Sequence, residues 1–357
     1  MNKGNRSVLW LLKPYLLKYK KLWIWGFVSV ALTDIFMLAN PWLLKRAIDS
    51  LKENVTTIHL ALYAGAILCA TIISSVFRYF MRQTLIVASR KIEYDFRNDF
   101  FTHLLTLDRP YYNKRPTGDI MARATSDIDA VRNMVGPGIM NLSSTIITLA
   151  MALPLMITIS PKLTLLSMTT MPVITLLVLF LGREVEKRYT KIQEQYSNIT
   201  ADAQENFSGI RVVKAYVQEQ AEVDNFSDMN LIYIKRNMSM IKIWGMFFPA
   251  IALFGGVALI MVVWFGGKAV ALGTMTLGSF VAFISYLLML IWPMASLGWV
   301  IGLYQRGKAS LIRLKEILDA RPVVADKPGA ISRKIIGKIK LQGLRFAYDS
   351  SEILKGI

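Results

Sequence analysis

The stretch GLYQRGKAS at 302–310 places Gly302, Gly307 and Lys308 at the G-x-x-x-x-G-K spacing of a phosphate-binding loop. Such a loop needs flexible residues whose backbone N–H groups cradle phosphate, and a serine or threonine after the lysine to hold Mg²⁺. Here Ala309 follows the lysine. Apolar residues then recur at helical spacing, at Leu311, Leu314, Ile317 and Leu318. The pattern predicts a continuing helix and not a nucleotide site.

Other residues that could do chemistry are few. The single cysteine, Cys69, excludes a disulfide framework, and His59 and His103 lie too far apart to form a metal-binding motif. Of the 357 residues, 54% are hydrophobic and 18% are charged, whereas soluble domains have about 25% charged residues. This composition is typical of a membrane protein.

Six apolar segments have about the length of 20 residues that a helix needs to cross a bilayer. They lie at 22–44, 58–80, 135–157, 163–182, 243–266 and 275–304. The first segment is too long for a signal peptide and lacks a small-residue cleavage site, so we expect it to be retained. The sequence thus predicts an all-α membrane fold with six transmembrane helices.

The distribution of positive charge predicts the orientation. The formal net charge is +18, and 37 of the 42 Lys and Arg residues fall on the same side of the predicted membrane as the N-terminus. Cytoplasmic connections carry such an excess of Lys and Arg. We therefore expect a multi-pass protein with both termini in the cytoplasm, and no nucleic-acid partner.

The cytoplasmic connections should be long helical hairpins. No glycine or proline, the residues that most reliably break helices, occurs between Gly65 and Pro110. A helix over 58–107 would be about 75 Å long, well beyond a bilayer of about 40 to 45 Å. The same reasoning applies between Gly182 and Gly209 and between Gly209 and Gly245. The four legs form two hairpins that project about 30 Å from the membrane.

Each hairpin has a short, punctuated tip. In RPYYNKRPTGDIMARATSDID (109–129), we expect Thr117 to cap a short helix with Asp119 in its first turn, and Ser126 with Asp129 to form a capping box for the returning leg. In ENFSGIRVVKAYVQEQ (205–220), Gly209 breaks the helix. The tips are interpreted as contact surfaces; plain turns that close the hairpins are the alternative.

These features together resemble a known family. The six segments, the two hairpins and the stretches YYNKRPTGDIMARATSDID, FSGIRVVKAYVQE and QRGKASLIRLKEIL resemble the transmembrane half of ATP-binding cassette (ABC) exporters of the type IV fold, over essentially the whole chain. In that family the tips are coupling helices that dock into nucleotide-binding domains. The resemblance assigns Thr117, Gly118, Asp119, Ile120 and Arg123 to the first coupling helix, and Ser208, Gly209, Ile210, Val213 and Tyr216 to the second.

The resemblance also divides the chain. It implies a type-1 transmembrane domain at 1–319, a proline-containing linker at 320–336 and a truncated start of the nucleotide-binding domain at 337–357, where Ile339, Leu341 and Phe346 alternate as in strands. Tyr348 would stack on adenine; a buried or edge-strand tyrosine is the alternative. ATP and Mg²⁺ are the implied cofactors of the complete protein. Their principal binding motifs would follow Ile357, so the chain as given is not expected to hydrolyse ATP alone.

The implied function is ATP-driven export by alternating access, in a dimer with an identical or a different half-transporter, in a bacterial plasma membrane. Drug, lipid and peptide are all candidate amphipathic substrates. The alternatives are a non-enzymatic scaffold or channel that works with a separate ATPase, or a gene remnant. FAYDSSEILKGI at 346–357 favours an ATPase domain fused in the same chain.

Asp34 is the leading candidate for a substrate contact. A carboxylate inside a membrane segment is costly and therefore suggests a functional site; it would face either a cationic substrate or a Ser/Thr partner within the bundle. Apolar residues could line the same cavity, with packing or lipid contact as the alternative role. These candidates are Phe36, Phe247, Phe248, Met289, Trp292 and Trp299.

Overall fold

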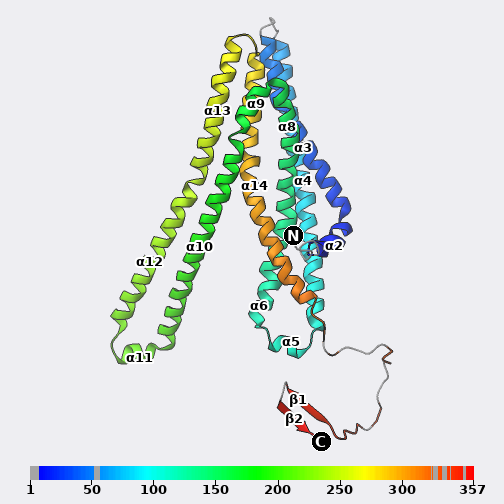
Figure 1. Cartoon of the computed structure of the whole chain (residues 1–357), viewed down its shortest axis with the longest axis vertical. Helices are drawn as coiled ribbons and strands as arrows, with labels where there is room; N and C mark the ends of the chain where they lie inside the picture. The colour runs from blue at the N-terminus through cyan, green and yellow to red at the C-terminus, as the bar shows by residue number, and fades with distance from the viewer. Residues whose placement is uncertain are drawn as a thin grey trace.

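The computed structural model describes residues 8–51, 57–322, 324, 329–331, 336–337, 339–348 and 351–357. Long helices dominate it and run nearly parallel to the long axis of the molecule (Figure 1). The longest are α3 (Lys20–Ser50), α4 (Thr57–Thr106), α8 (Ile139–Ile159), α10 (Met171–Ser208), α12 (Glu219–Gly245), α13 (Phe247–Ala271) and α14 (Leu277–Leu318). The shorter elements are a 3₁₀ turn Leu9–Leu12, α2 (Lys13–Lys18), α5 (Arg109–Asn113), α6 (Thr117–Ala122), α7 (Ile128–Asn133), α9 (Pro161–Met168) and α11 (Ile210–Ala215).

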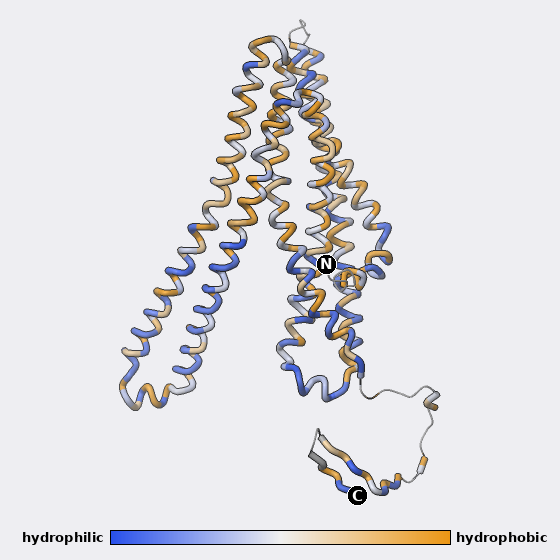
Figure 2. The backbone as a smooth tube through the Cα atoms, in the orientation of Figure 1, coloured by the Kyte–Doolittle hydropathy of each residue, from blue (hydrophilic) through white to orange (hydrophobic). Residues whose placement is uncertain are grey.

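The six predicted membrane segments are confirmed as six helical stretches long and apolar enough to span a bilayer. Hydrophobic residues cover one end of the molecule, and the legs of both hairpins become hydrophilic towards their tips (Figure 2). Helices suit this environment because each satisfies its own backbone hydrogen bonds where water is absent. The chain is therefore an all-α, multi-pass membrane protein.

The predicted long hairpins are also confirmed. α4 contains 50 residues without interruption and is about 75 Å long. α10 ends at Ser208, directly before the predicted break at Gly209. α12 ends at Gly245, and the single residue Met246 separates it from α13. Each hairpin therefore continues the membrane helices as stiff legs.

The predicted caps at the first tip are wrong. Pro116 occupies the N-cap of α6, and Thr117 is its first helical residue without a capping hydrogen bond. The Ser126 hydroxyl donates to the Ala122 carbonyl at 2.8 Å, inside a π-helical turn Arg123–Asp127 that joins α6 directly to α7. Serine in a continuous helix satisfies its hydroxyl on the preceding turn, so no new helix start exists for a capping box.

Two apolar clusters hold the helices together. The first lies among α3, α4, α7 and the end of α14, with Phe96, Phe100 and Leu314 fully buried. The second lies among α8, α10, α13 and α14, around Phe283 and Leu290. The first cluster thus extends from the membrane segments into the first hairpin, and α14 contributes to both clusters.

The stretch that resembles a phosphate-binding loop is helical throughout, within α14, as predicted. Leu311, Leu314 and Ile317 are fully buried. Gly307 packs against Met134, so its missing side chain permits close helix contact and not a phosphate-binding loop.

The C-terminal strands form a two-stranded antiparallel sheet of β1 (Arg345–Tyr348) and β2 (Ser351–Lys355). Phe346 lies in β1 as predicted, whereas Ile339 and Leu341 precede it as exposed residues outside any strand. Alternation alone does not form a strand there, because no strand among the described residues pairs with these positions. Most of the predicted linker at 320–336 lies outside the described residues.

A glycine contact at the end of the bundle opposite the tips yields a stability prediction. The backbone N–H of Gly278 donates to Asp49 at the end of α3 at 2.9 Å, and a Cβ there would collide with the Lys45 carbonyl and the Asp49 carboxylate. We expect Gly278→Ala to lower the free energy of unfolding by about 1 to 3 kcal/mol. The matched control is Gly267→Ala on α13, where no atom lies within 4 Å of the added Cβ. Equal thermal unfolding midpoints of both variants in detergent would contradict this packing.

Candidate functional site

The first hairpin tip, α5 and α6, is built into the body of the molecule. Ile120 of α6 is only 6% exposed and belongs to the same apolar cluster as Leu311, Leu314 and Ile317 of α14. Thr117, Gly118 and Asp119 are exposed on the outer side. α6 therefore buries one side chain in a core that it shares with α14 and leaves its other face exposed.

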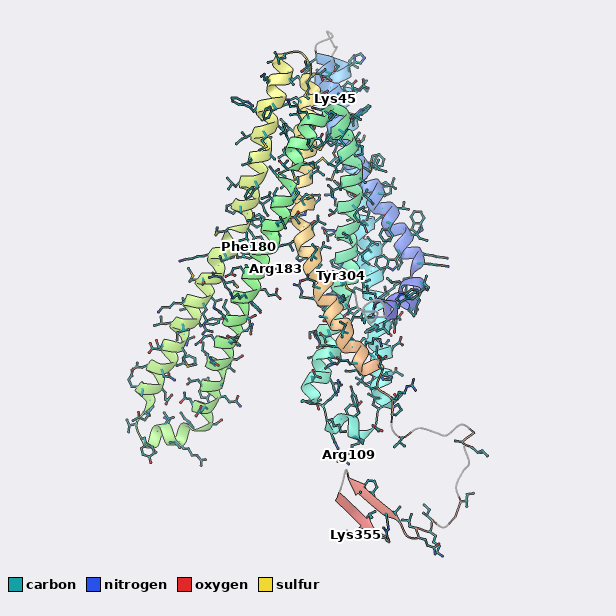
Figure 3. The ribbon with its side chains drawn as sticks, in the orientation of Figure 1. Lys45, Arg109, Phe180, Arg183, Tyr304 and Lys355 are labelled. Atoms are coloured by element: carbon teal, nitrogen blue, oxygen red, sulfur yellow. The ribbon has the colours of Figure 1, made fainter. Side chains whose placement is uncertain are left out.

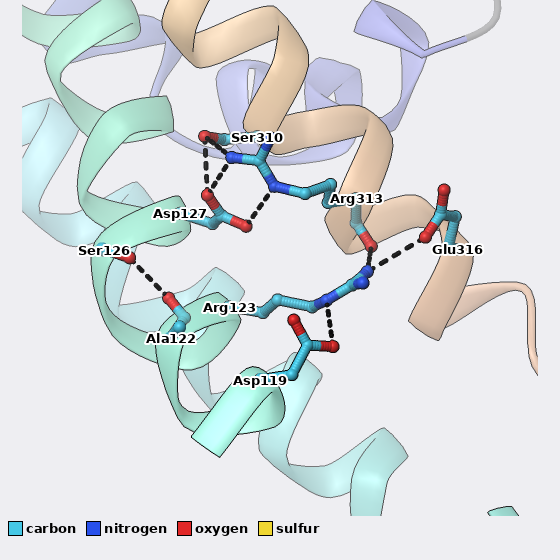
Figure 4. Close-up of polar contacts among 8 residues, drawn as sticks. All are labelled: Asp119, Ala122, Arg123, Ser126, Asp127, Ser310, Arg313 and Glu316. Atoms are coloured by element: carbon cyan, nitrogen blue, oxygen red, sulfur yellow. Dashed lines mark hydrogen bonds and ion pairs between the residues drawn. The ribbon is translucent and has the colours of Figure 1, made fainter. Parts of the chain in front are cut away.

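Arg123, which follows α6 and is largely buried, joins the tip to α14. Its Nε contacts Asp119 at 3.0 Å within the tip, and its Nη1 donates to the Arg313 carbonyl at 2.7 Å (Figure 4). The same Nη1 lies 3.0 Å from the Glu316 carboxylate. One guanidinium thus bridges the tip and the last turns of α14 through three acceptors.

Asp127 makes a second link one turn further on. It accepts a hydrogen bond from Ser310 Oγ at 2.8 Å and from Arg313 Nε at 2.9 Å, and Arg313 Nη2 contacts the same carboxylate (Figure 4). Burial would raise the pKa of Asp127, but the hydrogen bonds from Arg313 and Ser310 and the charge of Arg313 outweigh burial, so this pKa lies below its ordinary value. The carboxylate is therefore ionised and bound to α14 at neutral pH.

α4 completes this connection. His103, near the end of α4, hydrogen-bonds through Nε2 to the Ile317 carbonyl at 3.0 Å. At the tip, the Tyr112 hydroxyl donates to the Leu104 carbonyl at 2.6 Å. We call the contacts of Arg123, Asp127 and His103 with α14 the tip clamp. The tip clamp makes the first tip and the end of α14 one mechanical unit, because both polar bonds and an apolar core join them.

The second tip, α11, is built differently. α11 and α12, both described in full, contain no buried residue. Exposed apolar side chains cover the turn: Phe207 77%, Ile210 40%, Val212 61%, Tyr216 73% and Val217 79%. Val213 and Gly209 are partly buried, and Ser208 is exposed.

Backbone geometry fixes the shape of the second tip. Gly209 N–H donates to the Glu205 carbonyl at 2.8 Å, and Gln218 N–H donates to the Val213 carbonyl at 2.9 Å. Val217 adopts a left-handed conformation with φ of 53°, which costs a β-branched residue about 1 to 3 kcal/mol. The turn holds apolar side chains in water in a defined arrangement, as expected of a surface that binds another protein domain.

Asp34 lies in α3 and is only 4% exposed. Ser144 Oγ of α8 lies 3.2 and 3.3 Å from its two carboxylate oxygens. The carboxylate thus has a hydroxyl partner between two membrane helices, which is one of the two environments that the sequence suggests.

The remaining cavity candidates are distributed over three helices. Phe36 of α3 stacks on Phe77 of α4, with ring centroids 6.3 Å apart. Phe247 of α13 and Met289 of α14 pack against the second apolar cluster. Exposed side chains are found at Phe248 (65%), Trp292 (67%) and Trp299 (47%). Tyr348 is the last residue of β1, and its side chain lies outside the described part of the chain.

Sequence reasoning missed the partners in the tip clamp. Asp127 and Arg313 are separated by 186 positions, and Arg123 and Glu316 by 193. No spacing rule connects residues so far apart. The available signal was local: Ser310 and Arg313 lie one helical turn apart, so both can face a single carboxylate.

The sequence of this chain is similar to those of known transporters. Residues 23–294 match the family model of the ABC transporter transmembrane region. The chain is 33% identical over 344 residues to the probable multidrug resistance ABC transporter ATP-binding/permease protein YheI of Bacillus subtilis, covering 96% of this chain and 58% of that relative. It is 29% identical to the multidrug resistance-like ATP-binding protein MdlA of Escherichia coli, covering 86% of this chain and 53% of the relative. It is 24% identical to an ATP-dependent lipid A-core flippase of Syntrophus aciditrophicus, and the match covers 99% of this chain and 58% of that relative.

The tip clamp gives a pH-dependent stability prediction. In a double-mutant cycle of Asp127→Asn and Arg313→Gln, we expect a coupling of about 1 kcal/mol in the free energy of unfolding at pH 7, since Arg313 is half-exposed. The folded-state pKa of Asp127 is lowered, so the coupling is present above the ordinary carboxyl pKa of about 3.9 and is lost as pH falls below that value. Unfolding in detergent across this range measures it. A coupling that is absent at pH 7, or that persists unchanged well below pH 4, would contradict the clamp.

Proposed function

Because the chain belongs to the ABC transporter transmembrane family, we propose that it forms the membrane half of an ATP-driven exporter. In this proposal two such halves, identical or different, enclose a path for amphipathic or hydrophobic substrates and expose it alternately to the two sides of the membrane. The chain spans 58% of the length of YheI. ATP hydrolysis is therefore assigned to the whole transporter and not to the residues described above.

The charge distribution supports the orientation. The hairpins and both ends of the chain lie on the side that carries 37 of the 42 Lys and Arg residues. By the positive-inside rule this side is cytoplasmic. We place the protein in a bacterial plasma membrane, in line with the bacterial relatives.

The observation that carries the proposal is the contrast between the two tips. α11 presents exposed apolar side chains at the end of a hairpin whose legs bond to each other, for example from Gln195 to the Met229 carbonyl, while α11 and α12 contain no buried residue. α6 presents only its outer face, because its inner face and the tip clamp join it to α14. In the proposed transporter both tips are coupling helices that dock on nucleotide-binding domains.

This arrangement converts domain motion into helix motion. A force on the first tip passes to the end of α14 through the tip clamp, and a force on the second tip passes directly along α10 and α12. ATP, held with Mg²⁺ by nucleotide-binding domains, supplies the free energy, and it shifts the equilibrium only by as much as it prefers one conformation. The membrane segments then move as extensions of the legs.

The substrate class is proposed from the relatives and from the membrane residues. The names of the relatives include multidrug resistance proteins and a lipid A-core flippase. Asp34 lies between α3 and α8 and would attract a cationic group, while the exposed Phe248, Trp292 and Trp299 would offer apolar contact. A drug, lipid or peptide with an apolar body fits these residues.

The proposed domain arrangement places the transmembrane domain at 1–319, a linker at 320–336 and the start of a nucleotide-binding domain at 337–357. The antiparallel pair β1 and β2 agrees with the beginning of such a domain. Tyr348, at the end of β1, is the candidate for stacking on adenine.

The second tip offers the direct test of coupling. Ile120 is unsuitable, since a charge there would disrupt a buried core. We expect Ile210→Asp combined with Tyr216→Ala to lower substrate-stimulated ATPase activity and transport at least tenfold in proteoliposomes of the complete transporter, because a desolvated apolar anchor is worth about 2 kcal/mol or more. The thermal unfolding midpoint should not change, since both side chains are exposed.

The matched control is Val223→Asp, which adds a charge at a residue of 60% exposure on the neighbouring leg α12. This control should keep transport coupled to ATP hydrolysis. Full transport by the double variant of the tip would exclude α11 as a coupling element.

A further inference from the structure

The two legs of the second hairpin form a groove that the proposed transport mechanism does not use. Its lower part has a volume of about 510 Å³ and is lined by Glu184, Lys187, Arg188, Lys191, Glu194, Ile232, Lys235, Arg236 and Ser239. A second part, of about 430 Å³, shares Arg188, Lys235 and Ser239 and is completed by Ile234, Met238, Lys242 and Ile243. We call the two parts together the basic groove.

The groove begins where the membrane segment ends. On α10 the change from apolar to charged residues occurs between Phe180 and Arg183, both labelled in Figure 3. The groove residues Glu184 to Lys191 extend about 2 to 12 Å beyond that level at about 1.5 Å per residue. The headgroup region of a leaflet is about 5 to 8 Å thick. The upper half of the groove therefore lies at headgroup depth.

The charges of the groove favour an anion. Five of the residues that line the lower part are cationic and two are anionic. Arg188 is held by Glu184 at 3.0 Å and also contacts Ser239, and Arg236 donates to the Lys191 carbonyl. Across the described part of the chain, no ion pair engages the ammonium groups of Lys187, Lys191 and Lys235. Two arginines are thus already positioned, and three lysines have free donors.

The upper part adds an apolar wall. Ile234, Met238 and Ile243 line it beside Lys242, and no acidic residue does so. A ligand that fits both parts has an anionic, hydrogen-bond-accepting head and an apolar body that enters the membrane. Lysines at this depth direct their ammonium groups towards headgroups while their stems cover apolar surface.

We propose that the basic groove binds the phosphate headgroup of an acidic phospholipid from the leaflet on the hairpin side. The lipid would brace α10 against α12 at the point where both legs leave the membrane, since its phosphate can bridge lysines of both helices. The inference depends on the orientation proposed above only for calling this leaflet cytoplasmic.

The test measures lipid retained by the purified full chain in detergent, by native mass spectrometry, during titration with dioleoylphosphatidylglycerol or dioleoylphosphatidylcholine. We expect preferential retention of phosphatidylglycerol. Each nearby lysine is worth about fivefold in affinity for acidic lipid. The triple variant Lys187→Gln, Lys191→Gln and Lys235→Gln should therefore bind about 100-fold more weakly.

The matched control removes the same charge on the same side of the membrane outside the groove. Lys20→Gln, Lys21→Gln and Arg82→Gln change three exposed cations and should leave retention unchanged. If both triple variants lost the same amount of retained phosphatidylglycerol, general surface charge would explain the binding and the proposal would be overturned.

Two further outcomes would also overturn it. If inorganic phosphate protects the groove lysines from acetylation and phosphatidylglycerol does not, the ligand is a soluble anion. If the groove variant retains lipid but loses self-association, the groove contacts a second copy of the chain. None of these measurements requires ATP. A result that overturns the lipid site would therefore leave the transport proposal intact.

Discussion

The architecture depends on one constraint: backbone groups inside a bilayer must be hydrogen-bonded without water, which leaves helices as the economical solution. In this chain the membrane helices continue as helices beyond the membrane. α4 continues for 50 residues and α10 for 38 without a break, so apolar membrane segments and charged legs are parts of the same rods. A displacement at a tip is therefore transmitted along α4 or α10 by an unbroken hydrogen-bond ladder, whereas the leg α12 meets the membrane helix α13 at Met246.

The two hairpins use this stiffness differently. The first is held by an apolar core and by the tip clamp, in which Asp127 and Arg123 engage the end of α14. The second hairpin lies outside both apolar clusters of the described residues: its legs bury Ile192, Gln195 and Ile199 of α10 and no residue of α12, and its tip exposes Tyr216 and Val217. The first tip is thus fixed to the end of α14, whereas the apolar side chains of the second tip are exposed and could contact a partner. The basic groove lies at the root of this freer hairpin, where a headgroup would restrain it most effectively.

Much of the fold could be predicted from the sequence, because the patterns that specify membrane spans and long helices are local. Hydropathy predicted the six spans, and the absence of glycine and proline between Gly65 and Pro110 and between Gly182 and Gly209 predicted the long legs. Predictions from local sequence were wrong where the neighbouring backbone determines the structure. Ser126 bonds back to Ala122 within a continuous helix, and Ile339 pairs with no strand in the part of the chain that the structure describes. The tip clamp could not be predicted, since its partners meet only after the chain has crossed the membrane repeatedly.

In the proposed transporter, the first tip and the end of α14 move as one body while the second tip moves relative to them. Pulsed electron paramagnetic resonance on the complete transporter, with Cys69 replaced, tests it through spin labels on two pairs of sites. With ATP, the distance between labels at Lys114 and Lys214 on the two tips should change, whereas the distance between Thr125 and Ile312 across the tip clamp should not. A change across the clamp as large as that between the tips, or no change in either pair, would contradict the account.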